Sequence, residues 1–299
     1  MEFYVSWSHS DVLFADYFDN CNILVSAVPD NRRAIGRIKT RPRNLLLDSG
    51  SVYYARQRLR PPVQTVFQTQ LDMIEDLNFG TNIQMVHLDE PMINKSTLVE
   101  CYRAMERTLY NAYEFLHLFQ THHFQSTIQP MGVIQGFDGP SVRYAARELK
   151  KMGYNSFGIG SLLTQHPDKQ LHLIQEAATI VGPQQLHVFG VTGLAQMKEM
   201  IKLGITSFDS TRPTMAAVYF QLFYSNPFRT YLLADSRSTK TLSRLSEPLP
   251  CGCPVCLVNP KEMFTVGPRK FAKLRAVHNY YHLTKTLEHL AEQENQGEI

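Results

Sequence analysis

The stretch Gly204-Ile-Thr-Ser-Phe-Asp-Ser-Thr-Arg-Pro213 ends a short apolar strand on a carboxylate, Asp209, and leads into a predicted helix over residues 214–224. Where such a strand belongs to a parallel barrel, an Asp at its end can act as a nucleophile, a base or a metal ligand. The alternative is a helix cap, because Asp side chains often accept hydrogen bonds from the free backbone N–H groups at a helix start. The remainder of the chain decides between these interpretations.

Upstream of this stretch, short apolar strands alternate with helical patterns. Strands are predicted at residues 3–7, 22–27, 44–47, 85–88, 128–134, 156–159, 186–191 and 206–208. Apolar residues at helical spacing predict helices at residues 63–77, 96–119, 141–152, 169–180 and 194–203. This alternation favours an α/β fold whose parallel sheet closes into a (β/α)8 TIM barrel over residues 1–235, with a doubly wound open sheet as the alternative.

Polar and small residues gather where the predicted strands end. They are Asp48, Asp89, Gln135, Gly136, Gly160, Ser161, Gly190 and Asp209, and the aromatic Phe189 lies among them. Each has an ordinary structural explanation, such as a cap or a turn. Because the carboxyl ends of barrel strands share one rim, their coincidence predicts an active site there.

The chain changes character after residue 235, where a linker-like segment leads to Cys251-Gly-Cys253-Pro-Val-Cys256. Zinc takes four ligands in a tetrahedron and accepts three Cys and one His. A predicted helix over residues 269–291 offers His278 and His282 on one face. We expect His278 to be the fourth ligand, with His282 as the alternative, and so predict one structural zinc ion in a C-terminal subdomain over residues 236–299. Three reduced structural thiols are the competing interpretation.

Composition limits the class of protein. No apolar run of about 18 residues predicts a transmembrane helix, so no membrane partner is expected. The first residues lack the pattern of a signal peptide, and five Cys with three close together do not resemble a secreted disulfide framework. These features predict a cytoplasmic protein. A net charge of +3 says little about nucleic acid, so local clusters matter more.

Basic residues cluster in three places. Two clusters, at residues 31–43 and 54–60, flank Asp48, and a third lies beside the predicted zinc site at Arg269, Lys270, Lys273 and Arg275. A solvated face is the ordinary explanation for such clusters. The functional interpretation is a track for phosphates that joins the barrel rim to the zinc subdomain.

Several motifs occur in the order found in tRNA-guanine transglycosylases, which include the queuine and archaeosine tRNA-ribosyltransferases. They are Asp48-Ser-Gly, Gln135-Gly136, Gly160-Ser-Leu, Phe189-Gly-Val, Phe208-Asp-Ser and the Cys251 to Cys256 motif with His278-Asn279. The resemblance extends over residues 44–290. It implies a TIM barrel with a zinc subdomain and the exchange of guanine in a polynucleotide for a 7-deazaguanine base of the preQ0 or preQ1 type.

The resemblance also implies roles for individual residues. Asp209 matches the family's nucleophile, and Asp48 matches its general acid/base. Base binding falls to residues that match the family's pocket: Asp89 at the purine edge, Gln135, Gly136 and the Gly160-Ser161 backbone at the base carbonyl, and Phe189 with Gly190 at one face of the base.

Three features depart from the family pattern. Its Asp-Ser-Gly-Gly-aromatic run is Asp48-Ser-Gly-Ser-Val52 here, so the second stacking face is expected from Tyr53, with Tyr54 as the alternative. Ser161 replaces a Gly, which implies a change in base choice. The segment before Asp48 is short, which makes the chain resemble most the DpdA-type branch that modifies DNA.

The resemblance therefore implies DNA as the polynucleotide partner, in a bacterium or a phage-infected host, with tRNA as the alternative. It leaves open a homodimer or an accessory protein. A non-catalytic partner subunit is a further alternative, but such a subunit would be expected to lack one of the three carboxylates. A metal-dependent barrel hydrolase would need several His residues at strand ends, and only His87 lies near one.

Overall fold

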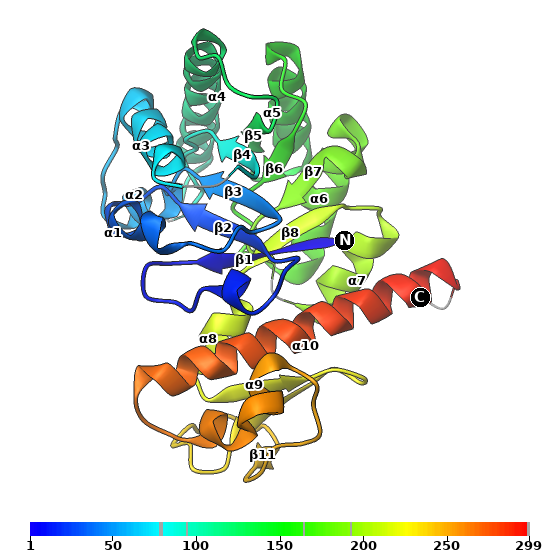
Figure 1. The fold of residues 1–299 in the computed structure, drawn as a ribbon. Coiled ribbons are helices and arrows are strands. Elements are labelled where there is room, and N and C mark those ends of the chain that lie inside the picture. Colours follow the sequence, from blue (N-terminus) through cyan, green and yellow to red (C-terminus); the bar gives the residue numbers. More distant parts are fainter. Residues whose placement is uncertain (78–79, 94, 164, 192, 298–299) are drawn as a thin grey trace.

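The computed structural model describes residues 1–77, 80–93, 95–163, 165–191 and 193–297 of the chain. Eight strands form a closed barrel in chain order (Figure 1). The strand β1 (Glu2–Trp7) pairs in parallel with both β2 (Asn22–Ser26) and β8 (Ser207–Ser210), and this closes the ring. The others are β3 (Asn44–Asp48), β4 (Asn82–Val86), β5 (Ile128–Ile134), β6 (Phe157–Ile159) and β7 (Leu186–Val188). The predicted TIM barrel is confirmed.

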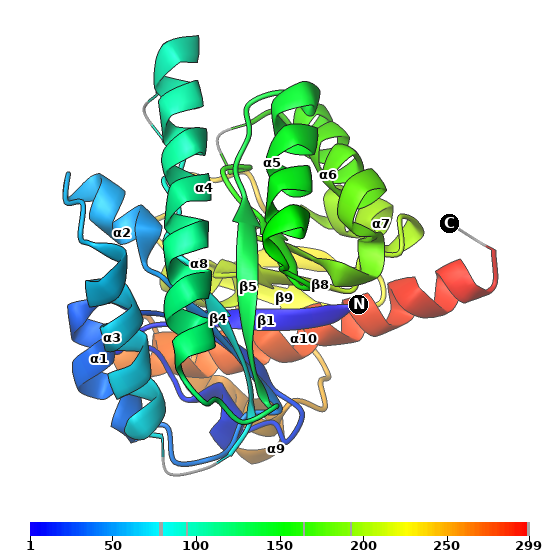
Figure 2. The same cartoon turned by 90° about the horizontal axis from the view of Figure 1, so that it is seen from above.

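Helices cover the outside of this barrel (Figure 2). The longer ones are α3 (Val63–Glu75), α4 (Leu98–Thr121), α5 (Gly139–Met152), α6 (Pro167–Val181) and α7 (Leu194–Lys202). Local sequence explains their limits. A capping box starts α4 at Thr97, another starts α5 at Asp138, and Gly153 ends α5 in the left-handed conformation with φ of 103°.

In the first half of the barrel, one predicted strand needs correction and two helices were not predicted. The fourth strand covers Asn82–Val86 rather than residues 85–88, because its backbone pairs with β3 from Asn82 onward. The structure also contains two short helices, α1 (Pro29–Ala34) and α2 (Ser51–Arg56), that the pattern did not indicate. Both lie on the early barrel loops, where helices of six residues are too short to show a clear period.

The barrel interior is a packed core. Side chains from the consecutive strands β1 to β5 fill it, and Phe189 packs against them; the buried members are Tyr4, Leu24, Leu46, Val86, Met131 and Val133. A filled interior leaves the carboxyl ends of the strands as the place where a ligand can enter. Within the described residues, no helix is both long and apolar enough to cross a membrane.

The predicted helix over residues 214–224 is wrong in its second half. The helix α8 (Arg212–Val218) stops, Phe220 takes a left-handed conformation with φ of 59°, and the chain continues as β9 (Gln221–Tyr224). Pairing of β9 with β10 (Arg229–Leu233), and of β10 with β11 (Arg244–Leu245), builds a small three-stranded sheet. The apolar residues of 221–224 therefore serve a strand, which the helical spacing concealed.

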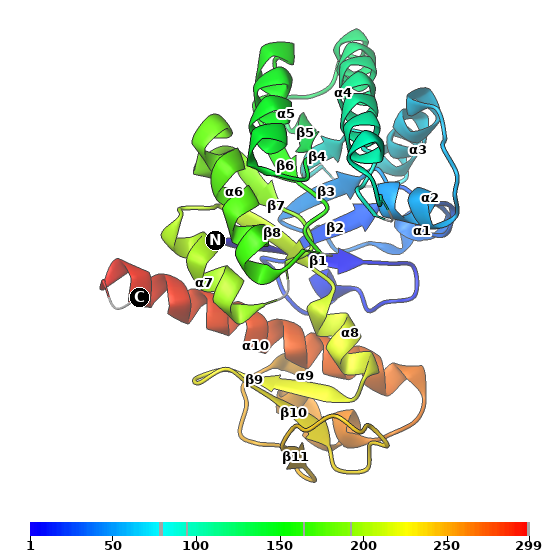
Figure 3. The same cartoon turned by 180° about the vertical axis from the view of Figure 1, so that it is seen from behind.

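The last helix, α10 (Arg269–Asn295), lies between this small sheet and the barrel (Figures 1 and 3). Arg275 is only 1% exposed, and it donates hydrogen bonds to backbone carbonyls at Ala217, Met263 and Thr265. Burial lowers the pKa of its guanidinium to about 10. Arg275 is therefore a structural residue, and its assignment to a basic surface is corrected.

Candidate active site and zinc site

A cavity of about 330 Å³ opens at the carboxyl ends of the strands. It brings together seven of the residues expected to bind or transform a base, namely Asp48, Asp89, Gln135, Gly160, Ser161, Phe189 and Gly190, and with them Asp209. Apolar side chains supply much of the remaining wall, including Leu24, Val52, Ile93 and Leu163. An apolar cavity with a few converging polar groups is the usual form of a small-molecule site.

Asp209 is buried and held by two donors. The backbone N–H of Gly190 donates to its Oδ1 at 2.9 Å, and the Ser6 hydroxyl donates to its Oδ2 at 2.8 Å. The α8 helix is capped at Thr211, so Asp209 is not the cap of that helix. The helix-cap interpretation is therefore wrong, and the carboxylate faces the cavity with fixed orientation.

Asp48 lies across the same cavity. Its Oδ2 accepts hydrogen bonds from the Ser26 hydroxyl at 2.8 Å and from the Gly50 backbone at 3.0 Å. Burial raises the pKa of Asp48, and the nearby charge of Asp209 raises it further. A carboxyl whose pKa is raised toward neutrality is suited to proton transfer.

Asp89 and Gln135 form a buried polar pair. The Gln135 amide donates to Asp89 Oδ2 at 2.5 Å, while its own Oε1 has no protein partner among the described residues. Burial raises the pKa of Asp89 to about 6. The pair thus offers one anionic acceptor and one free carbonyl acceptor to a ligand in the cavity.

We expect an Asp89→Asn substitution to stabilise the folded protein above pH 6. The folded-state pKa is raised from 3.8 to about 6, so between these values the folded chain keeps a proton that the unfolded chain has lost. Folding then binds protons, and the contribution of Asp89 to stability falls as the pH rises through this window.

Thermal unfolding at pH 4, 5, 6 and 7 tests this expectation. The advantage of the Asn variant should grow from near zero at pH 4 to a plateau of at most about 3 kcal/mol above pH 6. Asp19→Asn, at an exposed carboxyl outside the cavity, is the matched control. An advantage that does not change with pH would contradict the burial of an ionised Asp89.

Gly158 and Gly160 leave room for two side chains that line the cavity. A Cβ on Gly158 would lie 2.2 Å from Cε2 of Phe189, and a Cβ on Gly160 would lie 2.6 Å from Nε2 of Gln135. Such distances require displacement of the neighbouring side chain. The absence of side chains at these positions therefore places the Phe189 ring and the Gln135 amide against the cavity.

Ser161 has a role that a Gly could not fill. Its φ is 59°, in the left-handed region, and its hydroxyl accepts a hydrogen bond from the Met92 backbone at 2.7 Å. This bond ties the loop after β6 to the loop after β4. The departure from a Gly-Gly pair therefore fixes one loop against another at the pocket rim.

Two expected site residues do not line the cavity. Gly136 lies behind it, where a Cβ would approach Val142. Tyr53 is half-exposed on α2 and makes an edge contact with Tyr54, whereas Val52 lines the cavity instead. The helical turn at α2, which was not predicted, directs these side chains differently from an extended loop.

Sequence patterns missed several residues that orient the site. Ser6 and Ser26 hold the two catalytic candidates, and alternation along β1 and β2 could have indicated their inward direction. His187 lies beside Asp209, with 3.5 Å between its Nε2 and Oδ1. Both ring nitrogens of His87 form hydrogen bonds with backbone groups, one with the Val133 N–H and one with the Leu88 carbonyl. His87 is therefore a structural residue rather than a metal ligand.

The Cys251, Cys253, Cys256 and His278 side chains form a zinc site apart from the cavity. Their ligand atoms all lie within 4.8 Å of one another. The distances from His278 Nδ1 to the sulfur atoms of Cys251, Cys253 and Cys256 are 3.8, 3.4 and 3.6 Å. Tetrahedral zinc with ordinary bond lengths places N and S about 3.6 Å apart, so the cluster fits this metal.

The surrounding hydrogen bonds decide between the two histidines. His278 donates from Nε2 to the Phe223 carbonyl at 2.8 Å, which leaves the Nδ1 lone pair for the metal. His282 accepts the Ser225 N–H at its Nδ1, so its Nε2–H faces Cys251 Sγ at 3.1 Å as a donor. His278 is confirmed as the fourth ligand, and His282 supports the Cys251 sulfur.

A closed barrel with buried carboxylates at its strand ends and a separate Cys3His site defines a zinc-containing TIM-barrel protein. Within that class, the chain belongs to the queuine tRNA-ribosyltransferase family, whose model matches residues 46–298. The resemblance noted from the motifs is thereby confirmed.

Curated relatives of this chain have different nucleic acids in their names. The DNA-guanine transglycosylase of Salmonella montevideo is 26% identical over 208 residues, which cover 67% of this chain and 46% of the relative. The tRNA-guanine(15) transglycosylase of Pyrococcus abyssi (strain GE5 / Orsay) is 27% identical over 52% of this chain and 26% of its own length. The queuine tRNA-ribosyltransferase of Chlamydia caviae is 25% identical over 56% of this chain and 46% of its own length. The chain thus spans less than half the length of these relatives.

Proposed function

We propose that this protein exchanges guanine in DNA for a 7-deazaguanine base through a covalent glycosyl ester on Asp209. The observation that carries the proposal is the convergence of Asp209, Asp48 and Asp89 on one cavity of about 330 Å³. The family match and the names of the relatives support the reaction type. The same exchange on tRNA is the second candidate.

Guanine suits the polar edge and the apolar face of the cavity. The N1–H and the exocyclic amine of guanine are donors, and they match the carboxylate of Asp89 and the free carbonyl of Gln135. The Phe189 ring would cover one face of the base, and Val52, rather than Tyr53, is the nearer candidate for the other. The base must leave its stack to reach this depth, which costs a few kcal/mol.

The chemistry divides into two displacements. In the first, the Asp209 carboxylate attacks C1′ of the nucleoside, the C1′–N9 bond breaks, and the departing guanine receives a proton at N9 from Asp48. In the second, N9 of the incoming base loses its proton to Asp48 and attacks C1′, and the ester to Asp209 breaks. Both carboxyl groups return to their starting states.

Two neighbours of Asp209 would help the first displacement. The Gly190 N–H and the Ser6 hydroxyl fix the carboxylate, so little reorganisation is needed when it attacks. His187, next to Oδ1, is a positioning candidate because its other nitrogen lies 3.0 Å from the Ser207 hydroxyl. The retention of all three carboxylates disfavours a non-catalytic partner subunit.

DNA is preferred to tRNA because the alignment with the DNA-guanine transglycosylase covers more of this chain than the alignments with the two tRNA enzymes. The zinc would be structural, since none of its four ligands lines the cavity. Reduced thiolates and a nucleic-acid substrate favour a cytoplasmic location. Residue 235 stays the proposed domain boundary, although β9 and β10, which precede it, form one sheet with β11, which follows it. The proposed protein partner is a second copy of this chain or an accessory protein.

A base-exchange assay tests the proposal. Purified zinc-loaded protein is incubated with labelled guanine and either plasmid DNA or bulk tRNA, and the label in the polymer is counted. Label in DNA alone is the expected result. Label in tRNA alone would overturn the DNA assignment and leave the chemistry, whereas label in neither polymer would overturn the transglycosylase function of the isolated chain.

A further inference from the structure

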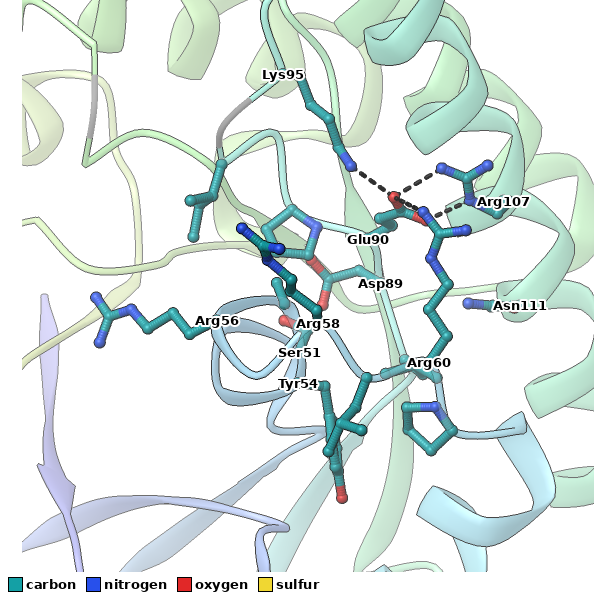
Figure 4. A pocket seen from close by; sticks show the side chains of 16 residues that line it. Ser51, Tyr54, Arg56, Arg58, Arg60, Asp89, Glu90, Lys95, Arg107 and Asn111 are labelled. Carbon is teal, nitrogen blue, oxygen red and sulfur yellow. Dashed lines mark hydrogen bonds and ion pairs between the residues drawn. The ribbon is translucent and has the colours of Figure 1, made fainter.

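A second and larger cavity, of about 690 Å³, adjoins the first. Figure 4 shows its wall, which the loop and helix after β3, the loop after β4 and the helix α4 provide. The two cavities share wall residues, namely Ser51, Arg56, Asp89, Pro91 and Ile93. The second cavity therefore lies directly beside the base pocket.

The second cavity is strongly basic. Its lining includes the cations Arg56, Arg58, Arg60, Lys95 and Arg107, against the carboxyls of Asp89 and Glu90. Five cations face two carboxyls, so the cavity carries a net positive charge even when both carboxyls are ionised. Cavities lined by one sign of charge concentrate ligands of the opposite sign.

Glu90 is occupied by its neighbours and does not neutralise the rest of the cavity. Lys95 contacts its Oε1 at 2.7 Å, and Arg107 contacts both carboxylate oxygens (Figure 4). Burial alone would raise the pKa of Glu90, but the hydrogen bonds from Arg107 and Lys95 lower it to about 2. Glu90 therefore stays ionised and organises one wall.

Arg56 and Arg58 differ from Arg107 in this respect. Within the described ranges of the chain, neither forms an ion pair with an Asp or Glu. Both lie on the segment that leads away from Asp48, and Arg56 reaches the wall of both cavities. Two guanidinium groups without a carboxylate partner, beside a base pocket, are suited to bidentate binding of a phosphate.

The backbone at Arg58 strengthens this inference. Arg58 has φ of 55° and follows the end of α2, where the Leu59 N–H donates to the Tyr54 carbonyl at 2.8 Å. Glycine is the favoured residue at such a helix end, and other residues cost about 1 kcal/mol there. A strained conformation that aims a long cation into a cavity is a recognised feature of functional sites.

We propose that the second cavity binds a phosphodiester next to the exchanged nucleoside, through Arg56 and Arg58. This inference rests on the proposed function, since a nucleotide turned into the first cavity keeps its flanking phosphates within one linkage of the base pocket. The ligand class is a backbone phosphate of a single-stranded or locally opened nucleic acid. Base identity plays no part in this contact.

Binding of a fluorescent 12-nucleotide single-stranded DNA with one central guanosine tests the proposal. Its affinity is measured by anisotropy at several salt concentrations for the wild type, Arg56→Gln and Arg58→Gly. We expect each variant to bind about tenfold more weakly. The slope of log affinity against log salt should fall by about 0.7 for each phosphate that the variant no longer binds. Arg58→Gly also relieves the left-handed strain, so its thermal stability should not decrease.

A modified oligonucleotide locates the phosphate. Neutral methylphosphonates replace the phosphates on either side of the guanosine, one at a time. One replacement should weaken the wild type about tenfold and leave Arg56→Gln and Arg58→Gly almost unchanged, because these variants already lack the arginine that binds this phosphate. Equal losses in wild type and variants for both replacements would overturn the proposal.

The matched control is Arg147→Gln, which removes the same charge from an exposed position on α5 outside both cavities. Its affinity and salt slope should equal those of the wild type. A loss of affinity in Arg147→Gln as large as that in Arg58→Gly would show that net charge alone explains the effect, and it would overturn the proposal.

The test separates this inference from the proposed function because it measures binding and needs no exchange. Altered salt slopes in a protein that exchanges no guanine would sustain the phosphate site and reject the transglycosylase. Unaltered salt slopes in a protein that exchanges guanine would reject the phosphate site and sustain the transglycosylase function.

Discussion

An Asp209→Asn variant is expected to lose base exchange by about 10⁴-fold or more, the range found when a covalent nucleophile is removed. An amide cannot form the glycosyl ester that holds the sugar between the departing and the incoming base. The fold should survive, because the amide oxygen can still accept the Gly190 N–H and the amide nitrogen can donate to the Ser6 hydroxyl oxygen.

Two readouts make this test specific. Exchange of labelled guanine measures turnover, and the mass of the denatured protein after brief incubation with oligonucleotide detects the ester. Ser6→Ala is the companion variant: it keeps the carboxylate but loses one positioning bond, and a decrease of about 10- to 100-fold is expected. Near-normal turnover by folded Asp209→Asn would remove Asp209 from the role of nucleophile.

Loss of the zinc site is expected to have the largest effect on stability. Cys253 is fully buried, and its sulfur accepts the Cys256 N–H at 3.4 Å, so a Ser in its place leaves a weak ligand and an incomplete site. Structural zinc contributes on the order of 10 kcal/mol to the folding of small domains. We therefore expect Cys253→Ser, or chelation of the wild type, to unfold the segment around the small sheet and α9 (Pro254–Val258).

Loss of the zinc is also expected to destabilise the packing of α10 against the barrel. His278 and Asn279 attach this helix to β9, and Tyr280 stacks against Phe3 on β1. A lower unfolding temperature and the loss of one zinc per chain, measured by calorimetry and elemental analysis, are the expected results. Full stability in metal-free wild type would show that the cluster is only a set of reduced thiols.

Matched variants sharpen the zinc prediction. Cys101→Ser removes a thiol on α4 outside the cluster and should keep one zinc per chain with little change in stability. His278→Ala should lose the metal, whereas His282→Ala should retain it and bind it more weakly, because only the hydrogen bond to Cys251 is removed. Equal zinc loss in both His variants would contradict the ligand assignment.

The motif that contains Asp209 illustrates which features a local sequence pattern can predict and which it cannot. A short apolar run followed by Asp predicted a strand end, and the eight strands occur in the predicted order. The same pattern could not distinguish a cap from a site residue. That choice depends on Ser6, 203 residues away in the sequence, and on Gly190, which approach Asp209 only after the barrel closes.

The wrong predictions also concern features that depend on contacts between segments far apart in the chain. The period of apolar residues over 214–224 fitted a helix, but β9 forms there because β10 and Asn279 satisfy its backbone groups. Tyr53 was expected in the pocket, yet α2, a helix of six residues that the pattern did not indicate, turns it away. A lysine- and arginine-rich run predicted a surface, but Arg275 is buried among three carbonyl groups from two other segments.

Strand alternation and close Cys spacing are local properties of the chain, and they predicted the barrel, the three carboxylates at its rim and the three thiols of the zinc site. The choice of His278 rather than His282 as the fourth ligand, and the basic cavity beside the base pocket, became visible only in the folded chain. Hydrogen-bond partners and shared cavity walls come from segments far apart in the chain, so no local pattern indicates them. The Phe223 carbonyl that fixes His278 lies 55 residues away, and the second cavity joins residues of α2 to residues of α4.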